Sequence, residues 1–115
     1  MKNTYTIIKI GEHSHPCKFG FNALRKYSLM TNTKLSELQN LGSDMSLDSA
    51  LTLCFCGIQD GYRSAKMEFN LTIDDLSDQF DGNFEAMEQV FETLAEQMND
   101  GFTEKKKKAK KVKKK

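Results

Sequence analysis

The sequence predicts a mainly α fold of the α+β class, with a short N-terminal β-hairpin packed on a bundle of four to five helices. Three observations support this prediction. Residues 4–10 are rich in β-branched and aromatic side chains, which favour strands. Residues 47–58 have apolar side chains at helical spacing, and from Ala50 to Ile58 only Thr52 and Gly57 are not strongly apolar. Residues 105–115 consist of nine lysines, one alanine and one valine. We therefore expect residues 1–102 to form a single helical domain and residues 103–115 to form a disordered Lys-rich tail.

The N-terminal hairpin is predicted from two short segments and a turn. Residues 4–10 give the first strand, Gly11 and Glu12 give the turn signal, and residues 13–19 can return as a second strand. Pro16 cannot donate a backbone hydrogen bond, so the second strand should be an edge strand or a broken one.

Two helices should follow the hairpin. Gly20 ends the strand pattern, and the first helix is expected to begin at Phe21 or Asn22 and to end before residues 31–33. Its predicted inward side chains are Phe21, Leu24, Tyr27 and either Leu29 or Met30, with Ala23 as a further candidate. A short second helix is expected over residues 35–41, with an apolar edge made of Leu35, Leu38 and Leu41.

Residues 47–58 are predicted to be the central helix of the core. Ser46 is a suitable N-cap residue, and apolar side chains recur on most sides of the helix. The segment is too short to span a bilayer. We expect the helix to fray over residues 57–61, which contain two glycines, and the pattern over residues 62–68 allows a loop.

The last two predicted helices are acidic. Thr72 and Asp75 form a pattern like a capping box, followed by an apolar stripe of Ile73, Leu76 and Phe80. The final helix is expected from Phe84 to about Met98, and residues 99–101 should stop it. Its predicted apolar side chains are Phe84, Met87, Val90 or Phe91, Leu94 and Met98.

The net charge of +1 hides two parts of opposite charge. Residues 1–104 contain eight basic and 16 acidic side chains, a net charge of −8, and all nine later basic residues are lysines. Residues 68–104 contain eleven acids and no base. The chain is therefore an acidic domain with a basic extension, and nucleic acid is not the expected partner of its folded surface.

The cysteines predict a reducing compartment. Cys17, Cys54 and Cys56 are an odd number, and the last two should diverge on a helix, so no disulfide framework is expected. Cys54 and Cys56 are interpreted as small core residues. The first residues lack an apolar signal core and no apolar run reaches 18 residues, so we expect a cytosolic protein that is neither secreted nor membrane-spanning.

No catalytic, cofactor-binding or metal-binding residue is predicted, and the chain is not expected to be an enzyme. His13, His15 and Cys17 would share one face of a strand, but no fourth zinc ligand is indicated, so a polar loop with an incidental cysteine is preferred. An acidic cluster consists of Asp74, Asp75, Asp78 and Asp81. The segment that contains them lacks the glycine and the final glutamate of a calcium-binding loop, so we interpret it as an acidic helix start, which the helix dipole favours.

The lysine tail allows three interpretations. It could bind phosphates electrostatically, fold back on the acidic surface of its own or a neighbouring chain, or keep an acidic protein soluble, which is preferred. No aromatic residue is interleaved with the lysines, so base stacking is not indicated. The alternative function that the sequence allows is a small regulatory or nucleic-acid-associated protein that uses this tail.

The order of the motifs resembles that of a known family. Phe19-Gly20-Phe21-Asn22-Ala23-Leu24-Arg25 is followed by a small helix with Leu35-Ser36-Glu37-Leu38, by the core helix over residues 51–58, and by Leu71-Thr72-Ile73-Asp74-Asp75-Leu76. This order, over residues 4–98, resembles the tail assembly chaperones of long-tailed, siphovirus-type bacteriophages or prophages.

The resemblance implies a non-enzymatic chaperone without cofactors. Such a protein binds and solubilises the largely helical tape-measure protein, recruits tail-tube subunits in the host cytoplasm, and is absent from the mature virion. Chaperones of this family are often made in two lengths by a programmed translational frameshift, and the lysine run would fit an A-rich slippery site. Self-association is also expected, whereas the residues that contact partners are not assigned.

Overall fold

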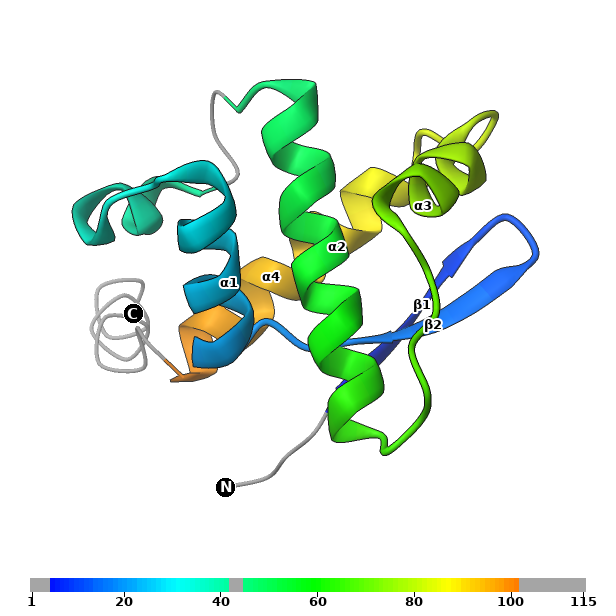
Figure 1. Ribbon diagram of the computed structural model, residues 1–115, viewed down its shortest axis with the longest axis horizontal. Helices are drawn as coiled ribbons and strands as arrows, with labels where there is room; N and C mark the ends of the chain where they lie inside the picture. Colours follow the sequence, from blue (N-terminus) through cyan, green and yellow to red (C-terminus); the bar gives the residue numbers. More distant parts are fainter. Residues whose placement is uncertain (1–4, 42–44, 102–115) are drawn as a thin grey trace, which may run out of the picture.

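The computed structural model describes residues 5–41 and 45–101, in which a two-stranded hairpin precedes the helices (Figure 1). The strands are β1 (Thr6–Ile10) and β2 (His13–Cys17). The helices are α1 (Phe21–Thr31), the 3-10 helix η1 (Leu35–Asn40), α2 (Leu47–Ser64), α3 (Ile73–Phe80) and α4 (Ala86–Gly101). The predicted fold class is confirmed, whereas the tail predicted over residues 103–115 lies outside the described residues.

The hairpin buries one of its faces. β1 and β2 pair antiparallel with Ile8 opposite His15, and both of these side chains are buried. Gly11 makes the turn with a φ of +66°, a conformation that favours glycine. Pro16 is accommodated because both strands of a two-stranded sheet are edge strands.

α2 is the central helix, and it is longer than predicted. The Ser46 hydroxyl accepts a hydrogen bond from the Ser49 backbone N–H at 3.1 Å, which confirms the N-cap. The predicted fraying over residues 57–61 is wrong, because the helix continues to Ser64. Even at 18 residues, neither α2 nor any other helix within the described ranges has the length and hydropathy needed to cross a membrane.

The chain that leaves β2 lies directly against two glycines of α2. The Lys18 backbone N–H donates to the Gly57 carbonyl at 2.9 Å. A methyl group at Gly61 would overlap the carbonyl group of Pro16 and lie 2.6 Å from the backbone nitrogen of Cys17. These tertiary contacts explain why the helix continues through residues of low helix propensity.

The other elements surround α2 unequally (Figure 1). α1 and β2 pack directly against it. α4 packs on β1 and touches α2 through the sulfur atoms of Met87 and Cys54, which lie 3.4 Å apart. The hairpin therefore lies between α2 and α4 as a shared packing element.

The last two helices match the prediction at the start of α3 and differ at both ends of α4. The Thr72 hydroxyl accepts from the Asp75 N–H and the Asp75 carboxylate accepts from the Thr72 N–H, each at 3.0 Å, which confirms the capping box. α4 begins at Ala86 rather than Phe84, because the chain enters it through i→i+3 turns. It also runs through residues 99–101 to Gly101, past the predicted stop.

Apolar spacing predicted only part of the buried surface. Leu24, Tyr27, Leu38 and Met87 are buried as expected. Phe21, Leu35 and Phe84 were predicted to face inward, as was one of Leu29 and Met30, but all five side chains are exposed. Because such surface is unfavourable in water, it marks the places where this domain could contact another polypeptide.

Candidate protein-binding site

His15 is a core residue of β2, which corrects the polar-loop interpretation of this segment. Its Nε2 lies 2.7 Å from Gln79 Oε1, and its Nδ1 lies 2.7 Å from the Tyr62 hydroxyl. Since an amide oxygen only accepts, this arrangement assigns the proton to Nε2 and lets Tyr62 donate to Nδ1. His13 is exposed and Cys17 is buried, and among the described residues no three His, Cys, Asp or Glu side chains form a group that could hold a metal ion.

The three cysteines are buried thiols, which confirms the interpretation of Cys54 and Cys56 as core residues. Burial raises the pKa of Cys54 to about 12 and that of Cys17 well above its usual value. Burial also raises the pKa of Cys56 to about 11, although the nearby Lys26 opposes this shift. All three remain protonated at neutral pH, so they have no nucleophilic role there.

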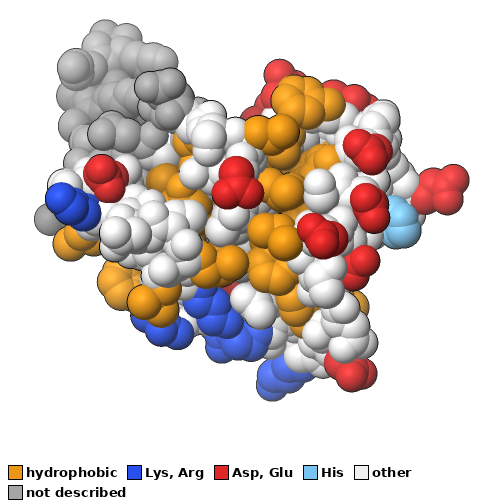
Figure 2. All heavy atoms as spheres, turned by 45° about the horizontal axis from the view of Figure 1, so that its top comes forward, with side chains coloured by type: hydrophobic (Ala, Val, Ile, Leu, Met, Phe, Trp, Pro, Cys, Tyr) orange, Lys and Arg blue, Asp and Glu red, His pale blue; other side chains and the backbone are white. Residues whose placement is uncertain are grey.

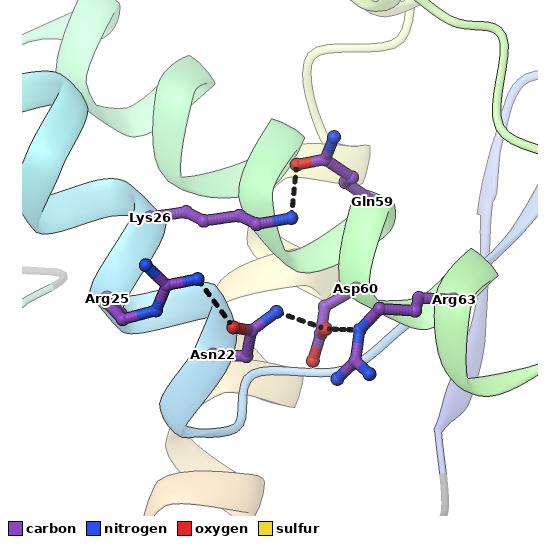
Figure 3. A network of polar contacts seen from close by, with 6 residues as sticks. All are labelled: Asn22, Arg25, Lys26, Gln59, Asp60 and Arg63. Atoms are coloured by element: carbon purple, nitrogen blue, oxygen red, sulfur yellow. Dashed lines mark hydrogen bonds and ion pairs between the residues drawn. The ribbon is translucent and has the colours of Figure 1, made fainter.

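A polar network that the sequence did not predict joins α1 to α2 (Figure 3). Asp60 is only 1% exposed, and its Oδ1 accepts hydrogen bonds from Asn22 Nδ2 at 3.1 Å and from Arg63 Nε at 2.8 Å. Arg25 donates to the Asn22 side-chain oxygen at 3.1 Å. The sequence signal for this network was Asp60, a single acidic residue next to the apolar segment of the central helix. Because the helix was predicted to fray over residues 57–61, this residue was not predicted to be buried.

The exposed apolar side chains of α1 and η1 line an open groove of about 250 Å³. Its lining residues are Phe21, Leu24, Arg25, Ser28, Leu29, Leu35 and Leu38. Leu24 and Leu38 are buried and form its floor, whereas Leu29 and Leu35 are 72% and 74% exposed. The groove therefore has an apolar floor and apolar side chains at its rim, beside the polar side chains of Arg25 and Ser28.

Local hydrogen bonds hold η1 in position beside α1. The Ser28 hydroxyl donates to the Thr33 carbonyl at 2.6 Å, and Asn32 ends α1 in the left-handed conformation with a φ of +57°. The Lys34 backbone N–H then donates to the Glu37 carboxylate at 2.8 Å at the start of η1. These short-range bonds preorganise the groove before any partner arrives.

Charge is distributed unequally around this groove. Described residues 5–67 carry seven basic and four acidic side chains, whereas residues 68–98 carry nine acidic and no basic side chains. In Figure 2, Lys and Arg lie mainly along the lower left of one face, Asp and Glu lie mostly at its right and top, and hydrophobic side chains form a band between them. The exposed Arg25 places a positive charge at the groove itself.

Comparison with protein-family models, curated proteins and solved structures found no match. The groove must therefore be interpreted from its own chemistry. It offers a preformed apolar surface with one cation at its rim, and its single hydroxyl, that of Ser28, already donates to Thr33. Such a surface is suited to binding a polypeptide through apolar side chains.

Proposed function

We propose that this chain is a tail assembly chaperone of a long-tailed phage or prophage. In this role it binds and solubilises the tape-measure protein and recruits tail-tube subunits during tail morphogenesis in the host cytoplasm. The order of sequence motifs supports the family, and the α1–η1 groove supports a site for the client. The observation that carries the site is the exposure of Leu29 and Leu35 beside a buried apolar floor.

The groove fits the side chains of a helix better than a small molecule. Its volume of about 250 Å³ lies below the roughly 300–1,000 Å³ of typical small-molecule pockets. An amphipathic helix could place apolar side chains from successive turns along α1 and η1. Arg25 at the rim would favour an acidic side chain beside that apolar stripe.

The proposal expects a reading frame for a long, helical tape-measure protein directly downstream of the gene for this chain, and the test is co-expression of the two proteins. Wild type should keep the tape-measure protein soluble. The variant L29S/L35S should reduce the soluble fraction about tenfold or more, because it removes two apolar rim contacts without disturbing buried residues. The measurement is quantitative blotting of the soluble and pelleted tape-measure protein.

Leu47 provides the matched control. It is 66% exposed at the start of α2 and does not line the groove, so L47S removes similar apolar surface elsewhere. L47S should solubilise the client as wild type does. The proposed function is contradicted if wild type leaves the client insoluble, and the proposed site is contradicted if L29S/L35S behaves like L47S.

Deleting residues 105–115 separates the chaperone from the nucleic-acid alternative. The chaperone proposal expects client solubilisation to survive largely unchanged, because the groove lies on α1 and η1. If the chain instead acts through its basic tail, the deletion should abolish a salt-dependent affinity for nucleic acid. Client solubility and a filter-binding assay on the same two proteins decide between these outcomes.

A further inference from the structure

A second exposed apolar surface lies at the start of α4. Phe84, in the turn that precedes this helix, is 68% exposed. Together with Met87 and the side chains of Glu85 and Glu88 it lines an open hollow of about 400 Å³. Met87 is buried, so it forms the floor of the hollow, and the Phe84 ring forms an apolar wall. An apolar segment that covered the ring would remove unfavourable surface from water.

The acidic rim of this hollow continues along α4. Glu88, Glu92 and Glu96 follow one another at steps of four residues, so they lie on one side of α4. Glu85 lies in the turn just before the helix, and all four side chains are exposed. None of their carboxylates has a hydrogen-bond or ion-pair partner within the described parts of the chain. The surface thus combines an apolar hollow with an unpaired line of negative charge.

The sequence after α4 has the complementary pattern. Val112 is preceded by Lys110 and Lys111 and followed by three more lysines. An aliphatic side chain flanked by cations matches an apolar hollow flanked by carboxylates. The α1–η1 groove, by contrast, has Arg25 at its rim, and this charge would repel the same segment.

The chain is long enough for this contact to form within one molecule. α4 has 16 residues and spans roughly 24 Å at 1.5 Å per residue. Val112 is eleven residues beyond Gly101, and these can extend to about 36 Å. A short linker also gives an effective concentration in the millimolar range, which favours the intramolecular contact over one with another chain.

We propose that residues 110–115 fold back along the glutamates of α4 and place Val112 in the Phe84 hollow of the same chain. The flanking lysines then neutralise Glu85 and Glu88. This inference is independent of the proposed chaperone function. The contact is electrostatic at its rim, so it weakens as salt shortens the screening length.

The 115-residue chain contains a convenient probe, because Val90 and Val112 are its only two valines. With methyl-labelled valine, NMR should show nuclear Overhauser effects between the Val112 methyl groups and the Phe84 ring at about 20 mM salt. These effects should be lost at about 500 mM salt, where the Debye length is only a few ångströms. Val90 is fully buried and serves as the internal reference for an intact fold.

Two variants with equal charge changes test the site. E85Q/E88Q should abolish the Val112–Phe84 signal, whereas E68Q/D74N, which changes two exposed acids that do not line the hollow, should retain it. The proposal is overturned if wild type shows no signal at low salt, or if E85Q/E88Q retains it. It is also overturned if a mixture of differently labelled chains shows the signal only between molecules.

Discussion

Replacing Gly61 with alanine should destabilise the domain by at least about 2 kcal/mol, or prevent folding. The new methyl group would overlap the Pro16 carbonyl and lie 2.6 Å from the Cys17 nitrogen. Both are backbone atoms, and the hydrogen bond from Lys18 to Gly57 holds this segment against α2, so it cannot move away cheaply. Alanine would favour the helix by up to about 1 kcal/mol, and the steric cost should exceed that gain.

Equilibrium unfolding in urea, followed by circular dichroism, measures this effect. Ser64→Ala is the matched control, because it introduces the same side chain into α2 at a half-buried position and should change the stability by less than about 0.5 kcal/mol. If G61A were as stable as wild type, this result would contradict the close approach of the β2 backbone to Gly61 of α2.

Local signals predicted the starts of α2 and α3, whereas tertiary contacts decided how far α2 continues. Ser46 and Thr72 lie at N-caps as predicted, because capping depends on residues only three positions away. The continuation of α2 through Gly57 and Gly61 depends on the chain leaving β2, about 40 positions earlier. No local pattern contains that information. The fraying was predicted from the low helix propensity of the two glycines, which the tertiary contacts override.

At the candidate groove, too, sequence patterns predicted one part of the structure and not the other. Periodicity correctly marked α1 and η1 as apolar on one side, and Leu24 and Leu38 are buried. It also predicted Leu35 and either Leu29 or Met30 to be buried, whereas all three are exposed. An apolar stripe has the same spacing whether the domain's own core or a partner covers it, so sequence alone could not separate the core from the binding surface.

Asp60→Ala should lower the free energy of unfolding by about 2–4 kcal/mol, because it removes the buried carboxylate that links α2 to α1 by a hydrogen bond. The loss leaves the Asn22 side-chain N–H and the Arg63 guanidinium without their acceptor. α1 has no acidic residue in its first turn and no side-chain cap at Gly20, so Asp60 also supplies negative charge beside the positive end of its dipole. α1 carries the groove, so this carboxylate helps to position the candidate site.

Four further variants identify the origin of the effect. Asp60→Asn keeps the shape and an acceptor oxygen, so it should cost only about 1 kcal/mol. Arg63→Gln leaves the buried Asp60 carboxylate with Asn22 as its donor among the described residues, so it should cost about 1–2 kcal/mol, less than Asp60→Ala. The single variants Asn22→Ala and Asp60→Ala, with their double variant, should give a coupling energy of about 1–2 kcal/mol in urea unfolding. If the effects of Asn22→Ala and Asp60→Ala on the free energy of unfolding were strictly additive, Asp60 would act by filling space rather than by holding Asn22. The hydrogen bond between them would then not explain the position of α1 on α2.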